Sequence, residues 1–264
     1  MIESLKSSLK IDRENSVPWN GFLGVIYALF MFIATQIFGA FLLMIIPLSE
    51  NLSWKQSADW LNSTIAHQFY YLLVVESLTI LSVIGFMKLW RAKLSLIGLR
   101  RIKLTDVLWG ILAYLAYFFI FLIVMVVISK IFPSLNTSTK QQVGFDNPTG
   151  NIAMIMTFIS LVVLPPIAEE IVVRGFLYSS FKKISPKFLA IILTSALFGA
   201  AHLPEGVGGL LWVGFIDTFI LSVVLIFLRE KTGGIYAGMV SHFLKNGSAF
   251  FALYVAANIT GYIR

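Results

Sequence analysis

Apolar runs long enough to cross a lipid bilayer recur along the chain, separated by short polar segments. A transmembrane helix needs about 20 mostly apolar residues, and only helices and closed barrels satisfy every backbone group in lipid. The runs therefore predict an all-α, polytopic membrane protein of about eight transmembrane helices around a polar cavity. The predicted spans are 21–47, 69–90, 107–131, 151–180, 187–203, 209–228 and 233–263, with the last range shared by two helices that meet at 246–248. One long, kinked helix over 233–263 is the alternative.

The predicted span at 151–180 is longer than a bilayer core requires, and it carries Pro165 and Pro166 near its middle. Proline has no backbone N–H and clashes with the carbonyl group four residues earlier. We therefore expect the prolines to bend or break this helix and to free backbone carbonyl groups close to the acids that follow.

Lysine and arginine alternate between rich and poor connections along the chain. The N-terminal tail, 88–103, 182–187 and 229–231 are rich in them, whereas the connections between these segments hold few or none. Because basic connections stay in the cytoplasm, we expect a multi-pass integral membrane protein with both termini cytoplasmic, in the plasma membrane of a bacterium.

The composition of the chain supports this interpretation and excludes some functions. Of 264 residues, 58% are hydrophobic and 12% are charged, against about 25% charged in soluble domains. The net charge of +7 is spread over the short connections, so it indicates topology and not a nucleic-acid partner. The absence of cysteine excludes disulfides, a thiol nucleophile and cysteine metal sites.

Glu169, Glu170 and Arg174 lie within one strongly apolar run, where charged residues are costly and usually functional. On a helix, Glu170 and Arg174 share one face, whereas Glu169 is turned by about 100°. We expect Arg174 to neutralise Glu170, so that both act as supporting residues and Glu169 stays available for chemistry. The alternative is a buried ion pair that only fixes helix packing.

Two histidines lie within later apolar runs. His202 follows three small residues that allow another helix to approach closely, and His242 lies one helical turn before Asn246. Counted from the basic connections at about 1.5 Å per residue, Glu169, His202 and His242 all fall roughly 17–22 Å into the membrane. A common depth is what a shared site requires.

These residue types suggest hydrolysis. Glu169 and His202 could bind and deprotonate a water molecule, and His242 and Asn246 could donate hydrogen bonds to the oxyanion that forms. A catalytic zinc ion held by Glu169, His202 and His242, with Glu170 as the base, is the alternative. The zinc-binding spacing HExxH is absent and Asn is a poor zinc ligand, so we favour a site that requires no cofactor.

The ordered motifs Glu169-Glu170-x-x-x-Arg174, Phe198-x-x-x-His202 and His242-x-x-x-Asn246 resemble those of the CPBP family, which includes type II CAAX prenyl endopeptidases and bacteriocin-processing and immunity proteins. The resemblance covers about 161–250. It implies an eight-helix membrane endopeptidase in which the first Glu and first His activate water and the second His and Asn form the oxyanion site. Family members have often been labelled metalloproteases, so the resemblance also keeps the zinc alternative open.

The sequence therefore predicts an intramembrane endopeptidase that acts on a peptide or membrane-protein substrate. The alternative is a non-catalytic immunity or scaffold protein that binds a partner through the same cavity. We expect a cytoplasmic tail at 1–18, the first three helices at 19–150 and the catalytic helices at 151–264. Among other polar residues, Glu76 and Asp217 are expected to make packing contacts, with a place in the cavity wall as the alternative, and Glu205 to lie in a solvated turn.

Overall fold

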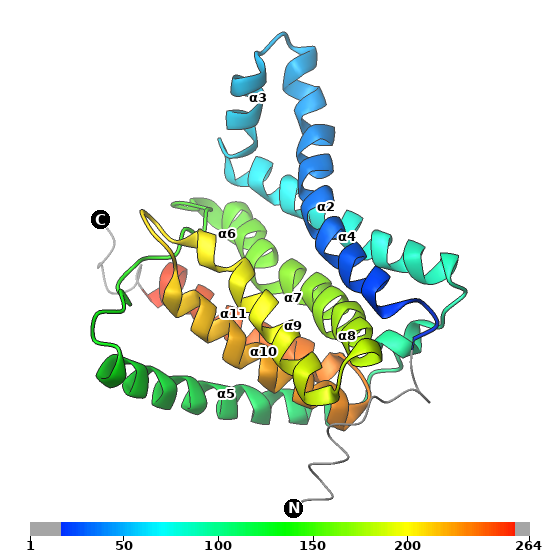
Figure 1. Cartoon of the computed structure of the whole chain (residues 1–264). Coiled ribbons are helices and arrows are strands. Elements are labelled where there is room, and N and C mark those ends of the chain that lie inside the picture. Colours follow the sequence, from blue (N-terminus) through cyan, green and yellow to red (C-terminus); the bar gives the residue numbers. More distant parts are fainter. Residues whose placement is uncertain (1–16, 257–264) are drawn as a thin grey trace, which may run out of the picture.

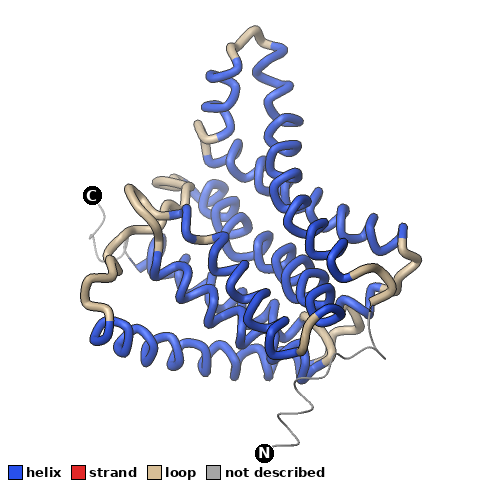
Figure 2. The backbone as a smooth tube through the Cα atoms, viewed as in Figure 1, coloured by secondary structure: helices blue, strands red, loops and turns tan. Residues whose placement is uncertain are grey.

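The computed structural model describes residues 17–256, which form a bundle of helices (Figures 1 and 2). The helices are α2 (Gly21–Ser49), α3 (Trp54–Leu61), α4 (Ile65–Leu89), η1 (Leu94–Ile97), α5 (Leu104–Ile131), α6 (Gly150–Phe158), η2 (Ile159–Val163), α7 (Leu164–Glu169), η3 (Glu170–Leu177), α8 (Tyr178–Ile184), α9 (Lys187–Ala201), η4 (Leu203–Glu205), α10 (Trp212–Thr232), α11 (Tyr236–Phe250) and η5 (Phe251–Ala256). The all-α class is confirmed. All but the last two residues of the predicted tail at 1–18 lie outside the described part.

Within 17–256, six helices are long and apolar enough to cross a membrane. They are Gly21–Ser49, Ile65–Leu89, Leu104–Ile131, Gly150–Ile184, Lys187–Glu205 and Trp212–Thr232. They coincide with the first six predicted spans, and they make the chain a multi-pass membrane protein. The count of eight is not confirmed.

The predicted boundary between a seventh and an eighth span at 246–248 is wrong. Helix α11 runs through these residues to Phe250, and η5 continues it to Ala256. Asn-Gly-Ser favours a turn in water, but a turn inside an apolar environment would leave backbone groups without partners. The alternative of one long helix therefore holds as far as Ala256, and the rest of the predicted range lies outside the described residues.

The prolines of the helix that carries the acids were expected to bend or break it, and of these two outcomes the break does not occur. The helix continues from Gly150 to Ile184, with π-helical turns in η2 and η3 on either side of α7. At the first of these turns, the N–H of Leu164 donates to the carbonyl of Ile159, five residues earlier. The wider turn lets the chain pass Pro165 and Pro166 while it stays helical.

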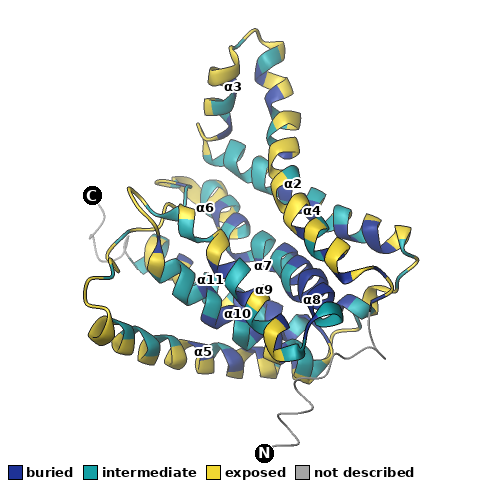
Figure 3. Ribbon diagram, in the orientation of Figure 1, coloured by how far each residue is buried: buried dark blue, intermediate teal, exposed yellow. Residues whose placement is uncertain are grey.

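An aromatic cluster joins the start of α2 to α4 and to the acid-bearing helix. The Trp19 ring stacks on Phe176 at 5.0 Å and meets Phe86 edge-on at 5.6 Å. Its indole Nε1 donates to Ser180 Oγ at 3.0 Å. Many apolar residues of α2 and α5 are exposed on the outside of the bundle, which suits contact with lipid (Figure 3). On α2 the exposed apolar residues include Phe22, Ile26, Phe30, Ile33 and Ile37.

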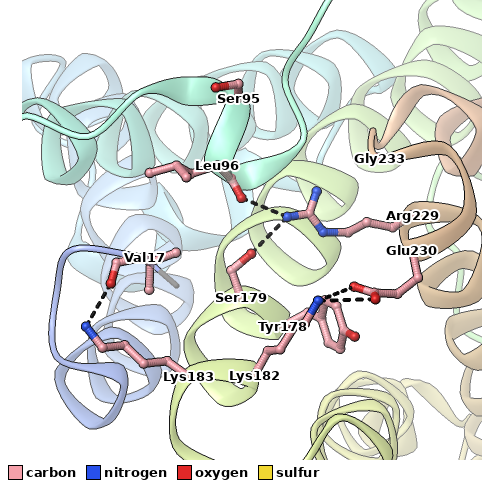
Figure 4. Close-up of a pocket in the computed structure, with 10 residues that line it drawn as sticks. All are labelled: Val17, Ser95, Leu96, Tyr178, Ser179, Lys182, Lys183, Arg229, Glu230 and Gly233. Carbon is pink, nitrogen blue, oxygen red and sulfur yellow. Dashed lines mark hydrogen bonds and ion pairs between the residues drawn. The ribbon is translucent and has the colours of Figure 1, made fainter. Parts of the chain in front are cut away.

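Basic side chains join several helix ends around one pocket (Figure 4). Lys183 at the end of α8 donates to the carbonyl of Val17 at 2.7 Å. Arg229 at the end of α10 donates to the carbonyl of Leu96 in η1 at 3.0 Å and to Ser179 Oγ at 2.9 Å. These contacts hold α8 against the neighbouring helices and so fix the end of the acid-bearing helix.

Candidate active site

A fully buried ion pair forms the centre of the site. Arg174 Nη1 lies 3.0 Å from Glu170 Oε1, and both side chains are 0% exposed. The pairing follows from their spacing of four residues on η3. The Arg174 guanidinium also lies over the Phe198 ring of α9, 4.2 Å from its centroid. The predicted ion pair is confirmed.

Glu169, the neighbour of Glu170, lines a cavity of about 220 Å³. Its side chain is 25% exposed. The cavity is lined by Ala28, Leu29, Phe32, Thr35, Gln36, Tyr71, Leu72, Val75, Glu76, Thr79, Ala168, Glu169, Val172, Val173, Leu177, Leu197, Phe198, Ala201, His202 and Glu205. Glu169 and His202 thus share one cavity, as their common depth in the sequence suggested.

The orientation of His202 is fixed by its own helix. Its Nδ1 lies 2.8 Å from the Phe198 carbonyl oxygen. Because a carbonyl can only accept a hydrogen bond, Nδ1 must donate, which leaves the lone pair of the neutral ring on Nε2. Gly199 lets α9 approach α10 closely, since a Cβ there would lie 3.0 Å from Phe215. The small residues before His202 therefore serve the close packing that the sequence predicted.

His242 lies between the two acids. Its Nδ1 is 3.3 Å from Glu170 Oε1, and its Nε2 is 3.6 Å from Glu169 Oε2. The ring is buried and stands perpendicular to the Phe198 ring, with 6.3 Å between the two centroids. His242 is not part of the cavity wall, but it contacts Glu169 directly behind that wall.

Asn246 makes a contact that sequence reasoning did not anticipate. Its Nδ2 donates to the carbonyl of Leu161 at 2.9 Å. The residues four and five positions after Leu161 are Pro165 and Pro166, so neither an α-helical nor a π-helical N–H can reach this carbonyl. The prolines do free a carbonyl group, as predicted, and Asn246 provides its donor. One N–H of the Asn246 amide remains for another acceptor.

Three further residues take part in this arrangement, and of these the sequence analysis did not identify Gly238. Gly238 gives Glu170 its space, because a Cβ there would lie 2.5 Å from Glu170 Oε2. Phe198 contacts both histidines and Arg174. Glu76 lines the cavity with Glu169, so the expected packing contact is wrong and the alternative holds. The only sequence signal for Glu76 was an acid within an apolar run.

Of the other polar residues, Asp217 agrees with the prediction from sequence and Glu205 agrees with it only in part. Asp217 pairs with Lys245 at 3.1 Å and accepts a hydrogen bond from the Tyr117 hydroxyl, which confirms a packing role. Glu205 accepts a hydrogen bond from Gln141 Nε2 at 2.8 Å. It also lines the cavity, which the prediction of a solvated turn did not include.

The residues proposed for zinc do not assemble into a metal site. Glu169 and His242 are in contact, but no group of three or more His, Asp or Glu within 17–256 is placed to hold a metal ion. His202 approaches the cavity from α9 and does not complete the set. The ligand arrangement required by the zinc alternative is therefore not present in this geometry.

Comparison with known proteins places the site in a family. Residues 151–248 match the family model described as Type II CAAX prenyl endopeptidase Rce1-like. This match supports membership of the CPBP family, whose motifs residues 151–248 carry. The match covers all three motifs, from the acids of α7 and η3 to Asn246 of α11. The residues of α2 and α4 that line the cavity lie outside the matched region.

A curated relative of the chain is the Uncharacterized protein YyaK of Bacillus subtilis (strain 168). It is 29% identical over 137 residues, which make up 50% of this chain and 44% of YyaK. The match thus spans less than half the length of that relative. No solved structure matches the chain.

The two adjacent acids should respond differently to the same substitution. Glu170→Gln should destabilise the protein by about 3–5 kcal/mol, because it leaves Arg174 buried without its counter-charge. Glu169→Gln removes a partly exposed charge that has no such partner, so its free energy of unfolding should stay close to wild type. Thermal unfolding of the two purified variants in one detergent measures the difference. Equal melting temperatures would contradict the central role given to the ion pair.

Proposed function

We propose that the chain is an intramembrane endopeptidase of the CAAX-protease type, which hydrolyses a peptide bond in a peptide or membrane-protein substrate. The observation that carries the proposal is that Glu169 and His202 line one cavity, with the lone pair of His202 on Nε2. A carboxylate and a neutral imidazole facing one space can bind a water molecule and accept its proton. The match to a family described as endopeptidases supports this assignment.

In the proposed reaction, the oxygen of a water molecule attacks the carbonyl carbon of the scissile bond. One proton of that water passes to Glu169, oriented by His202. The tetrahedral intermediate then collapses, the C–N bond breaks, and Glu169 returns the proton to the leaving amine nitrogen. No metal ion is needed for this balance of protons and charges.

The negative charge of the tetrahedral intermediate needs donors. His242 lies between Glu170, 3.3 Å from Nδ1, and Glu169, 3.6 Å from Nε2, and it donates to the oxyanion in the form that carries a proton on Nε2. Asn246 has a second N–H besides the one bonded to Leu161. Donors held in place before the reaction stabilise the developing oxyanion at little reorganisation cost.

The proposal is tested by comparing peptides released from membranes that contain either the wild-type protein or Glu169→Gln. The near-isosteric change removes the base and retains the shape of the side chain. Products present only with the wild type would identify the substrate and the cleavage site. Glu50→Gln, at the exposed end of α2, is the matched control and should behave as wild type. Identical peptide profiles for all three proteins, with binding of a partner retained in Glu169→Gln, would favour the non-catalytic scaffold.

Metal dependence gives a separate test. If Glu169 and His202 activate water alone, the purified active protein should contain no stoichiometric transition metal, and chelators should leave its rate unchanged. Elemental analysis and rates before and after chelation measure this. About one zinc ion per chain, with activity lost on stripping and recovered on refilling, would replace the metal-free mechanism.

Asn246 should affect both stability and rate. Asn246→Ala removes a possible oxyanion donor, so kcat should fall by about 100- to 1000-fold with little change in KM. It also leaves the Leu161 carbonyl without a donor, which should cost about 1–3 kcal/mol of stability. Asn246→Asp should be nearly inactive, since an ionised carboxylate donates to neither oxygen. Kinetics and thermal unfolding of both variants measure these effects.

The two roles of Asn246 can be separated with a second change. Pro165→Ala supplies a backbone N–H four residues after Leu161. Combined with Asn246→Ala, it should restore part of the lost stability but not the lost kcat. Recovery of kcat together with stability would show that Asn246 acts only by holding the helix, and would leave His242 as the only side-chain donor in the mechanism.

A further inference from the structure

The catalytic cavity has an unbalanced charge. Three carboxylates line it, from Glu76 on α4, Glu169 on α7 and Glu205 in η4. None of the lining residues within the described chain is lysine or arginine, and His202 is the only other ionisable group besides Tyr71. The rest of the wall is mostly apolar. Acids in such surroundings are costly unless a counter-charge is present.

Two of these carboxylates already have partners. Glu205 accepts a hydrogen bond from Gln141 Nε2 at 2.8 Å, and Glu169 is 3.6 Å from His242 Nε2. Glu76 has neither a hydrogen bond nor an ion pair with any residue in 17–256. Two threonines that line the same cavity do not provide one, because the hydroxyls of Thr35 on α2 and Thr79 on α4 bond to each other at 2.9 Å.

The cavity therefore offers one acid without a partner among the described residues, and this acid lines the same space as Glu169. A cationic group that entered would find a counter-charge at Glu76 and reduce the repulsion between the two acids. Apolar neighbours such as Leu29, Leu72 and Val75 would contact its hydrocarbon stem. Lysine and arginine side chains combine such a stem with a charged end.

We propose that Glu76 is a specificity-determining residue that receives a lysine or arginine side chain, or a free amine, of the substrate close to the scissile bond. This inference rests on the proposed endopeptidase function and adds the chemical class of the substrate. Glu76 lies on α4, whereas the motif residues lie on α7, η3, α9 and α11. It can thus select a substrate without taking part in water activation.

Binding is tested first, without any cleavage. Thermal unfolding of Glu169→Gln protein in detergent is measured with n-hexylamine and with 1-hexanol, which have the same chain length. The amine should raise Tm by roughly 2–4 °C more than the alcohol, and this difference should vanish when Glu76→Gln is added. Glu50→Gln in place of Glu76→Gln should retain the difference. An equal effect of amine and alcohol, or a difference that survives Glu76→Gln, overturns the inference.

Selectivity is tested second, with wild-type protein in liposomes and a library of apolar peptides in which one position is Lys, Arg, norleucine, Gln or Glu. Cleavage of Lys and Arg peptides should be faster than that of norleucine peptides by about tenfold or more. Glu76→Gln should reduce this ratio to about one while the norleucine peptides are still cleaved, and Glu76→Asp should retain most of it.

The outcomes distinguish the two proposals. Cleavage by the wild type without a basic preference refutes the role of Glu76 and leaves the endopeptidase assignment intact. Loss of all cleavage in Glu76→Gln, norleucine peptides included, places Glu76 in the catalytic machinery and also refutes the selectivity role. Amine binding that depends on Glu76, with no peptide cleaved by the wild type, supports the cation site and counts against the endopeptidase.

Discussion

The ion pair between Glu170 and Arg174 is the constraint around which this site is built. Two charges without access to water are tolerated only when they are paired and well surrounded. Each partner is also held by a different helix: Arg174 lies over Phe198 of α9, and Glu170 contacts His242 of α11. All three motifs thus meet at the pair. Because Glu169 is the neighbouring residue on the helix, burial of Glu170 turns Glu169 toward the cavity.

A second contact fixes α11 against the same helix, and it arises from the two prolines. In lipid, a carbonyl that loses its N–H must find another donor. Asn246 provides that donor for Leu161, and His242 meets Glu170 one turn earlier on α11. His242 and Asn246 therefore join α11 to the acid-bearing helix at two points, one before α7 and one after it. Glu169, at the end of α7, lies between these two contacts, which limit its movement.

The sequence predicts those features of the protein that depend on local patterns. Six apolar runs gave six helices at nearly their expected bounds, and the spacing of Glu170 and Arg174 gave their ion pair. The boundary at 246–248 was misjudged because turn propensities measured in water do not apply where a turn would expose backbone groups to an apolar medium.

Contacts between distant segments could not be read in the same way. The bond from Asn246 to Leu161 joins residues 85 positions apart. Glu76 has no spacing relation to any other motif, and only the packing of α4 against α7 brings it to the cavity of Glu169. An acid in an apolar run indicates a function, but the helix that it faces is decided by the tertiary fold.

The cavity joins two parts of the chain with different roles. The groups proposed to act in catalysis come from 151–248, the region that matches the endopeptidase family model, whereas much of the cavity wall comes from α2 and α4. The proposed water activation would need only the first part, because Glu169, His202, His242 and Asn246 all lie there. The fit of a substrate needs the second part as well, since side chains such as Phe32, Leu72 and Glu76 border the space that it would occupy. Proteins that share the three motifs can therefore keep one chemistry while the first helices change the substrate.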